Sequence, residues 1–207
     1  MLCGLDEAGR GPLAGPVCAA AVVLGGNFPC EMLDDSKKLK PAQREAARRV
    51  IADRAAAWAV GWATHAEIDA INILKASLLA MRRAFTCMTA TDSGPGLWPA
   101  LLETEASFGR CLAAPLPADL TAVADGTFAP DLPIPCTTLV KADASVPEVM
   151  AASILAKTAR DRLMEHYSRL YPEYGYGRHK GYPTKEHRRL IVQYGPSPIQ
   201  RMTFRST

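Results

Sequence analysis

The chain has 207 residues, of which 48% are hydrophobic and 22% are charged, and its formal net charge is +3. This length and composition predict one domain of ordinary size with a hydrophobic core, and no apolar run approaches the roughly 18 residues that a membrane span needs. The first motif begins so soon after Met1 that it leaves no room for a signal peptide, so we expect a cytoplasmic protein, with a monomer as the default state.

The predicted elements of the first half begin with two strands joined by a glycine-rich turn. An apolar start at Gly4–Asp6 runs into this turn, and the continuous apolar run Val17–Leu24 predicts a buried strand that pairs with it as a hairpin. Proline is favourable at a first helical position, so we expect a helix over Pro41–Arg54. The pattern then predicts a strand, a turn with helix-start chemistry, a helix and a surface loop at Trp58–Ala63, His65–Asp69, Ile71–Met88 and Thr89–Pro99.

The second half contains the longest predicted helix, Pro147–Tyr167, with Ser153, Lys157 and Arg160 on a polar face. The other expected elements are a short helix, two strands, an aromatic and basic loop, and a last helix N-capped by Thr184: Trp98–Leu112, Leu120–Ala124, Thr137–Lys141, Tyr174–Pro183 and Thr184–Tyr194. The tail from Gly195 onward is expected to lie against the surface.

Charge and cysteine usage bear on function. Residues 157–207 carry 11 Lys and Arg against 4 Asp and Glu, whereas the first 156 residues carry 13 against 17. An acidic centre with a basic C-terminal flank favours a polyanion held beside a metal site, although an ordinary solvated surface would give the same counts.

The six cysteines include no C-x-x-C pair, which argues against a zinc site and a disulfide framework and predicts reduced, mostly buried thiols.

The opening turn places two carboxylates beside a backbone that suits anions. Asp6 and Glu7 can share one site only where the strand frays into the loop, because successive side chains on a strand alternate between its faces. Gly9 and Gly11 permit a positive φ and let backbone N–H groups approach a ligand closely, and Arg10 adds a cation. The stretch therefore offers metal-binding oxygens next to an anion-binding backbone.

Four acids stand at the ends of predicted strands: Asp6, Glu7, Asp125 and Asp143. If these strands share a sheet, the acids converge at one edge, where they repel one another unless a cation neutralises them. An all-oxygen set favours Mg²⁺ or Mn²⁺, and two such ions would activate water and stabilise the leaving oxygen in phosphodiester hydrolysis. Spacing leaves open the alternative of four ordinary turn acids, because Asp is common in turns.

Residues 6–17 (DEAGRGPLAGPV) closely resemble the signature of ribonuclease HII. Further stretches agree with that family in the same order: Asp35–Leu39, Ile68–Leu74, Asp125–Gly126, Lys141–Asp143, Ala151–Lys157, Arg160–Asp161 and His179–Thr184. The likeness covers nearly the whole chain apart from about Thr89–Asp119. It implies a ribonuclease H-like α/β fold, in which helices flank a mixed five-stranded sheet, with a small C-terminal helical portion.

The resemblance further implies a catalytic domain over residues 1–164, with a helical insertion at about 89–119, and a C-terminal helical and loop portion over 165–207 that binds substrate. Members of the family hydrolyse the RNA strand of RNA/DNA hybrids and nick 5′ of single ribonucleotides embedded in duplex DNA, leaving 3′-hydroxyl and 5′-phosphate ends. The chain is thus expected to be an endoribonuclease of ribonucleotide excision repair that uses two Mg²⁺ or Mn²⁺ ions.

By the same resemblance, the catalytic and metal-binding carboxylates are Asp6, Glu7, Asp125 and Asp143. The backbone of Gly9, Arg10 and Gly11 would read the 2′-hydroxyl, which alone distinguishes RNA from DNA at a given position. Tyr182 would stack on the sugar of the deoxynucleotide just 3′ of the ribonucleotide. Contacts to backbone phosphates, which position a duplex without reading its sequence, are expected from Ser36, Lys37, Asn72, Ser153 and Lys157. The four histidines have no metal-ligand spacing, and we expect His179 at the surface.

Departures from the family pattern spare the predicted metal ligands. Thr127 stands where the family usually has Asn, Ala142 replaces the glycine of Lys-Gly-Asp, and Gln200–Phe204 replaces the common Arg-Arg-Ser-Phe. A duplex-binding module without activity would lack a carboxylate, and a dinucleotide-binding oxidoreductase needs a G-x-G-x-x-G spacing that this turn does not have. Ribonuclease HIII, the nearest enzymatic alternative, normally carries an N-terminal substrate-binding extension and a glutamate where Asp143 stands here.

Overall fold

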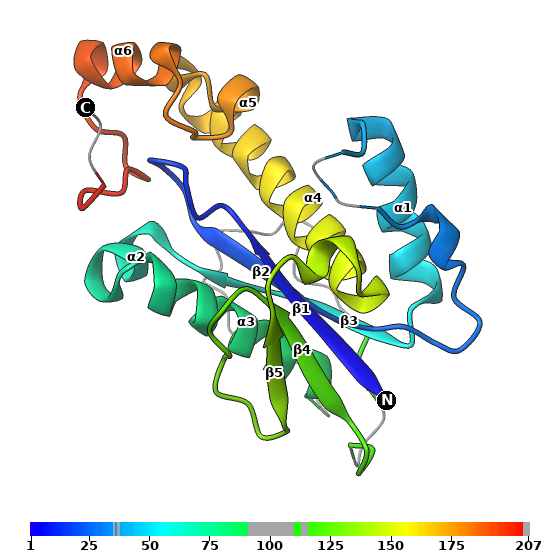
Figure 1. Ribbon diagram of the computed structural model, residues 1–207. Helices are drawn as coiled ribbons and strands as arrows, with labels where there is room; N and C mark the ends of the chain where they lie inside the picture. The colour runs from blue at the N-terminus through cyan, green and yellow to red at the C-terminus, as the bar shows by residue number, and fades with distance from the viewer. Residues whose placement is uncertain (35, 37, 91–109, 113–115, 205–207) are drawn as a thin grey trace.

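Five strands form one mixed sheet: β1 (Leu2–Ala8), β2 (Val17–Val23), β3 (Ala57–Ala63), β4 (Thr121–Asp125) and β5 (Cys136–Leu139). The computed structural model describes residues 1–34, 36, 38–90, 110–112 and 116–204, in which the strands follow the order β3-β2-β1-β4-β5 (Figure 1). β2 pairs antiparallel with both β1 and β3, whereas β4 lies parallel to β1 and β5 parallel to β4. The central strand β1 is therefore flanked by a hairpin partner on one side and by a parallel strand on the other.

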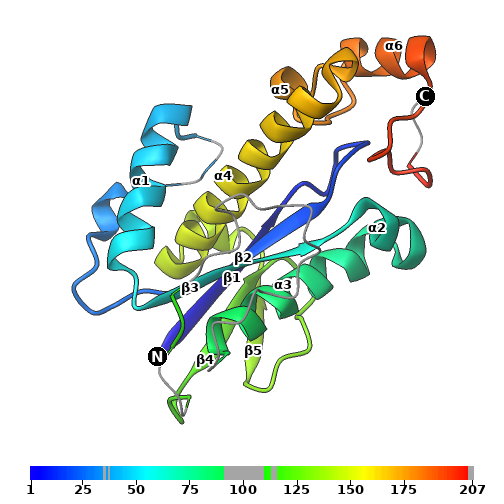
Figure 2. The same cartoon turned by 180° about the vertical axis from the view of Figure 1, so that it is seen from behind.

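Helices cover both faces of this sheet. On one face lie α2 (His65–Ile71) and α3 (Ile73–Thr89), with Leu5 and Phe85 among the buried side chains between α3 and the strands. The opposite face is covered by α4 (Pro147–Leu170), which crosses β1 and β2, and by α1 (Pro41–Arg54). Figure 1 shows α1 and α4 in front of the sheet, and Figure 2 shows α3 on the other side.

The chain beyond α4 folds back toward the turn that joins β1 and β2. It contains the short helical segments η4 (Pro172–Tyr174) and α5 (Tyr176–His179), and then α6 (Lys185–Tyr194). Two further single-turn helices are η1 (Cys30–Met32) and η3 (Ala142–Ala144). In the tail, Gln200 pairs with Ala14 as an isolated antiparallel bridge, so the end of the described chain is tied to the β1–β2 turn.

The predicted fold class is confirmed: helices flank a mixed five-stranded sheet, and a small helical portion follows at the C-terminal side. The β1–β2 hairpin is also confirmed, and α1 has the predicted bounds because Pro41 starts it. The predicted division between residues 164 and 165 falls inside α4, which continues to Leu170 without a break. That division stays a prediction.

Several local predictions were wrong. The expected turn at His65–Asp69 is the helix α2, and Asn72, with φ 68°, ends it before α3 starts at Ile73. The strand expected over Thr137–Lys141 is β5, which ends at Leu139 because Lys141 adopts a left-handed conformation with φ 62°. The expected loop over Tyr174–Pro183 contains the helix α5.

Ile199 and Arg201 are buried, so the tail enters the interior and does not lie on the surface as expected. The helix expected over Trp98–Leu112 and the insertion at about 89–119 fall mostly outside the described residues. Arg110, which is described, pairs in extended form with Trp58 at the edge of β3.

The six cysteines are free thiols. Cys3 and Cys18 are buried, but Cys30 and Cys111 are exposed and the remaining two are intermediate, so the prediction of mostly buried thiols was wrong. Burial raises the pKa of the Cys3 thiol to about 12, which keeps it protonated and unreactive at neutral pH. In the described part of the chain, no helix has both the length and the apolar composition to cross a lipid bilayer.

Candidate active site

Three of the predicted carboxylates lie at one edge of the sheet. The parallel pairing of β1 with β4 sets Leu5 opposite Ala124, so Asp6 and Asp125 occupy the next position on the two neighbouring strands. Parallel strands present their carboxyl ends at the same edge. Glu7 follows Asp6 directly on β1. The structure therefore brings acids from two segments more than 100 residues apart to one place.

Asp143 joins this edge through the side chain of Asp125. Oδ1 of Asp125 accepts a hydrogen bond from the Ala142 amide at 2.7 Å, which fixes the start of η3 beside the end of β4. Asp143 is the next residue of η3, and only 6% of its surface is exposed. All four predicted carboxylates thus lie on segments that meet at the ends of β1 and β4.

Asp6 is buried and hydrogen-bonded at the end of β1. It is 5% exposed, and its Oδ1 accepts a hydrogen bond from the Glu7 amide at 2.7 Å. Burial raises the pKa of Asp6 well above its ordinary value, the negative charges of Glu7 and Asp125 raise it further, and a hydrogen bond from Ser153 opposes the shift. The negatively charged carboxylates are therefore crowded at this edge of the sheet.

The donor set fits a divalent cation. Carboxylate oxygens are the ligands that Mg²⁺ and Mn²⁺ prefer, and a cation among them would relieve the repulsion that raises the pKa of Asp6. No three His, Cys, Asp or Glu side chains of the described residues lie close enough together to form a ready-made metal site.

The glycine turn follows the acids directly and lies beside an aromatic ring. Gly9 has φ +99°, a conformation that glycine adopts without strain. A Cβ placed on Gly11 would lie 3.7 Å from Cε1 of Tyr182, and Tyr182 is 41% exposed. Nη1 of Arg10 donates to Oε1 of Glu7 at 3.4 Å, which links the turn to the acids. The site thus combines a crowded set of acids, a tight turn and an exposed aromatic ring.

A family model described as Ribonuclease HII matches residues 3–92 and 124–207. The chain belongs to the ribonuclease HII family. Ribonuclease HII of Treponema denticola is 52% identical to it, with 99% of this chain and 98% of that protein covered, and ribonuclease HII of Dechloromonas aromatica is 44% identical, with 99% and 90% covered. Membership makes the chain a ribonuclease H endonuclease, a hydrolase of nucleic acid that depends on a divalent metal.

Solved structures agree with this membership. Ribonuclease H2 of Pyrococcus horikoshii is 26% identical and superimposes with a TM-score of 0.67 over 99% of this chain and 94% of that one. Bst ribonuclease HIII in complex with Mn²⁺ shares the fold at 18% identity, with a TM-score of 0.69 over 100% of this chain and 67% of that one. The chain therefore has the ribonuclease H fold.

The predicted phosphate contacts of this ribonuclease HII chain have varied surroundings. Ser36 and Ser153 are buried, and their hydroxyl oxygens lie 2.9 Å apart, which places them behind Asp6. Nζ of Lys157 donates to Oδ2 of Asp161 at 2.7 Å. Asn72 caps α3, because its Oδ1 accepts a hydrogen bond from the Lys75 amide at 3.1 Å. Lys37 lies outside the described residues.

His179 was expected at the surface, and this prediction was wrong. His179 and His187 are 8% and 0% exposed, and their rings stack with centroids 4.4 Å apart. Nδ1 of His179 accepts from the Gly181 amide at 3.2 Å, so its Nε2–H donates to the Tyr174 carbonyl oxygen at 2.8 Å. Both histidines are therefore structural groups that hold the segment leading to Tyr182.

Two arginines were missed as parts of the site. Arg160 was placed on a polar helix face and in a stretch resembling the family, and Arg201 was named only within the tail, but neither was given a site role, and their exposed fractions are 1% and 0%. Both side chains reach the glycine turn. Composition gave no signal for them, because the groups they bind are backbone carbonyls, which every residue carries.

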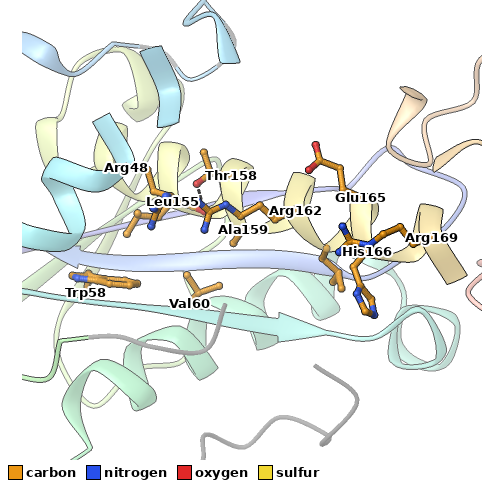
Figure 3. Close-up of a pocket in the computed structure, with 11 residues that line it drawn as sticks. Arg48, Trp58, Val60, Leu155, Thr158, Ala159, Arg162, Glu165, His166 and Arg169 are labelled. Carbon is orange, nitrogen blue, oxygen red and sulfur yellow. Dashed lines mark hydrogen bonds between the residues drawn. The ribbon is translucent and has the colours of Figure 1, made fainter. Parts of the chain in front are cut away.

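The chain also has a pocket of about 310 Å³ away from the carboxylate edge (Figure 3). Its lining comes from α4, α1 and β3, and it includes Trp58, Leu155 and Arg162. Arg162 and Arg48, which border it, both donate to Oε1 of Glu45 and are therefore already paired. None of the four predicted carboxylates lines this pocket.

Proposed function

We propose that this chain nicks the strand 5′ of single ribonucleotides embedded in duplex DNA, and also hydrolyses the RNA strand of RNA/DNA hybrids, leaving 3′-hydroxyl and 5′-phosphate ends. One observation carries the proposal: the acids at the end of β1 continue without a gap into a glycine turn that lies against an exposed tyrosine. A group that tests the sugar thus lies next to the groups suited to hydrolysis. Such an enzyme would serve the removal of ribonucleotides from DNA.

We assign metal binding to Asp6, Glu7, Asp125 and Asp143, which would hold two Mg²⁺ or Mn²⁺ ions. When bound, these ions supply water activation and stabilise charge on the leaving 3′-oxygen. The chain itself fixes the acids before any ion arrives: the Glu7 amide and Ser153 hold Asp6, and Asp125 anchors the segment that carries Asp143. An aspartate at position 143 favours ribonuclease HII over the glutamate expected for ribonuclease HIII.

Substrate recognition is assigned to the turn, to Tyr182 and to a set of phosphate contacts. Backbone groups of Gly9, Arg10 and Gly11 would bind the 2′-hydroxyl, which both donates and accepts hydrogen bonds. The exposed ring of Tyr182 would stack on the deoxyribose that follows the ribonucleotide. The phosphate contacts assigned here are Ser36, Lys37, Asn72, Ser153 and Lys157.

The proposal is tested with three labelled duplexes of one sequence: all-DNA, DNA with one ribonucleotide, and an RNA/DNA hybrid. With Mg²⁺ or Mn²⁺ we expect cuts 5′ of the ribonucleotide in the second duplex, cuts along the RNA strand in the third and none in the first. End-group analysis of the products identifies the 3′-hydroxyl and 5′-phosphate. An intact single-ribonucleotide duplex with both metals would overturn the proposal.

Tyr182→Ala tests the stacking role, with Tyr182→Phe as the matched control that keeps the ring. Tyr182→Ala should lower kcat/KM on the single-ribonucleotide duplex about tenfold, as expected for loss of one stacked base or sugar contact, and should affect the hybrid less. Tyr182→Phe should behave like the wild type. Equal losses on both substrates would contradict a role at the RNA-to-DNA junction.

A further inference from the structure

Two buried cations lie behind the glycine turn. The side chains of Arg160 and Arg201 are 1% and 0% exposed, and among the described residues neither has a carboxylate within ion-pairing distance. A buried charge is costly unless hydrogen bonds compensate it. Burial lowers the pKa of Arg201 to about 9, so the side chain still carries its charge at neutral pH. Its compensation comes from backbone carbonyls.

Arg201 binds four carbonyl oxygens of the turn between β1 and β2. Its Nη2 donates to Gly9 at 2.6 Å, its Nη1 donates to Arg10 at 3.0 Å and to Pro12 at 2.8 Å, and its Nε donates to Gly15 at 2.8 Å. One planar guanidinium therefore fixes the direction of four peptide groups. A lysine ammonium has three donors on one atom and cannot span them in the same way.

These bonds determine where the amide N–H groups of the turn point. In a trans peptide the C=O and the following N–H point in opposite directions. Because the Gly9 and Arg10 carbonyls are held toward the buried Arg201, the amides of Arg10 and Gly11 are directed away from it. In the described part of the chain, neither amide donates to a backbone carbonyl. They remain available as donors on the side of the turn that faces away from Arg201, and Gly11 itself lies beside Tyr182.

Arg160 connects the same turn to the segment that carries Tyr182. Its Nε donates to the Pro16 carbonyl at 3.0 Å, its Nη2 to Ala14 at 3.1 Å, and its Nη1 to Lys180 at 2.9 Å. The Leu13 amide donates to the Gly181 carbonyl at 2.8 Å, which adds a direct link between the two segments. The turn and the Tyr182 segment are thus held as one unit.

We infer that Arg201 and Arg160 are positioning residues for sugar recognition: Arg201 directs the amides of Arg10 and Gly11 toward the 2′-hydroxyl, and Arg160 fixes the turn relative to Tyr182. This inference rests on the proposed function, because it concerns how the proposed 2′-hydroxyl reader is built. Asp69 supports the arrangement from α2, since its carboxylate accepts from the amides of Met202 (2.8 Å) and Thr203 (3.0 Å) directly after Arg201.

Arg201→Lys tests the inference, with Arg82→Lys on the exposed surface of α3 as the matched control. Dissociation constants for the single-ribonucleotide duplex and for the all-DNA duplex are measured by fluorescence anisotropy, each in an Asp6→Asn background that prevents cleavage. We expect Arg201→Lys to lower the preference for the ribonucleotide about tenfold, the effect of one or two lost hydrogen bonds, with all-DNA binding unchanged. Arg82→Lys should change neither constant.

The outcomes separate the two proposals. If the wild type does not cut at a ribonucleotide, the proposed function fails. If it cuts but Arg201→Lys keeps its ribonucleotide preference, or loses affinity for both duplexes by the same factor, the positioning role is overturned, because a merely structural role would affect both alike. Circular dichroism shows whether Arg201→Lys is folded. If it is not, Asp69→Asn, at the partly exposed surface, is tested in its place by the same criteria, with a smaller expected loss of ribonucleotide preference.

A double-mutant cycle tests Arg160 on its own. Arg160→Lys, Tyr182→Ala and the double variant are compared in the cleavage of the single-ribonucleotide duplex. If Arg160 holds the turn relative to Tyr182, the two substitutions should not act independently. The fold loss of kcat/KM caused by Tyr182→Ala should then be at least about threefold smaller in the Arg160→Lys background than in the wild type. Additive losses would overturn this part of the inference.

Discussion

The carboxylate edge and the glycine turn are adjacent in sequence, but they solve opposite electrostatic problems. At the edge, Asp6 is buried beside the negative charges of Glu7 and Asp125, which together with burial raise its pKa. In the turn, a run of carbonyl oxygens points into the protein and is met by the guanidinium groups of Arg160 and Arg201. The carbonyl oxygens that Arg201 binds begin at Gly9, only three residues after Asp6.

The two regions should therefore differ in how much they depend on a bound divalent cation. The turn is held by bonds within the chain and should keep its shape with or without divalent ions. The carboxylate edge should gain stability from such ions, because binding to the folded state alone stabilises it by mass action. The two regions therefore respond differently to substitution, to metal and to acid.

Asp6→Asn should produce the largest effect. Loss of one negative oxygen ligand should lower the cleavage rate at least about 100-fold, as removal of one key electrostatic group does in other enzymes. The same change relieves the repulsion at the edge, so without divalent ions the melting temperature should rise. Nicking assays and thermal melts with and without Mn²⁺ measure both effects.

The matched control for Asp6→Asn is Asp53→Asn, an exposed acid near the end of α1, at the opposite end of the sheet. It should leave the rate and the Mn²⁺-dependent rise in melting temperature unchanged. An Asp6→Asn variant that Mn²⁺ stabilises as much as the wild type would contradict the assignment of Asp6 as a metal ligand.

Gly9→Ala should break the turn. A Cβ on Gly9 would lie 2.1 Å from Nε of Arg160, and the φ of +99° is strained for any other residue. We expect the free energy of unfolding to fall by about 1–3 kcal/mol and the cleavage of the single-ribonucleotide duplex to fall about tenfold or more. Urea unfolding and steady-state kinetics measure the two effects.

Gly26→Ala is the control for this experiment, because a Cβ on Gly26 meets nothing within 4 Å. It should leave both the urea midpoint and kcat/KM near the wild-type values. If Gly9→Ala were equally harmless, the described packing of Arg160 against the turn would be wrong.

Lowering the pH should destabilise the buried histidine pair next to the turn and stabilise the carboxylate edge, and this is the smallest of the expected effects. Burial lowers the pKa of His179 and of His187 below 6.5, so the folded state binds fewer protons than the unfolded chain. The stability from this pair is complete above about pH 6.5 and is lost as pH falls through the lowered values. The pKa of Asp6 is raised, so its protonation as pH falls stabilises the folded state.

His187→Gln separates these contributions. Between pH 7.5 and 5.5 the melting temperature of the wild type should fall more than that of the variant, with a difference on the order of 2 °C. His166→Gln, on α4 outside this cluster, is the control and should keep the wild-type slope. An unchanged slope in His187→Gln would show that the buried pair does not titrate in this range.

Local signals in the sequence were sufficient for much of the fold. Pro41 fixed the start of α1, the continuous apolar run predicted β2, and a polar residue at Thr184 predicted the start of α6, where its hydroxyl accepts from the His187 amide. The acids were singled out because each follows a predicted strand, and strands of one sheet could bring them to a common edge. A resemblance to a family then supplied the roles that spacing alone left open.

What could not be predicted depends on contacts between distant residues. The burial of Arg201 depends on a turn 192 positions earlier, and a lone arginine in a polar tail has no periodicity that reveals this. His179 appeared to be a surface residue because its neighbours are basic and polar, whereas stacking on His187 and two backbone bonds bury it. Asn72 breaks a helical pattern through its backbone conformation, which side-chain periodicity does not encode.

The bond between Arg201 and Gly9 also has a consequence for the order of synthesis. Ribosomes release the N-terminal residues first, so Gly9 emerges while residue 201 has not yet been added. The strands and most helices can begin to pack on the nascent chain, but the turn that is proposed to test the sugar cannot take its final form until almost the whole chain is made. Partial translation products would therefore carry Asp6 and Glu7 without a formed sugar reader, which would keep incomplete chains from acting as selective nucleases.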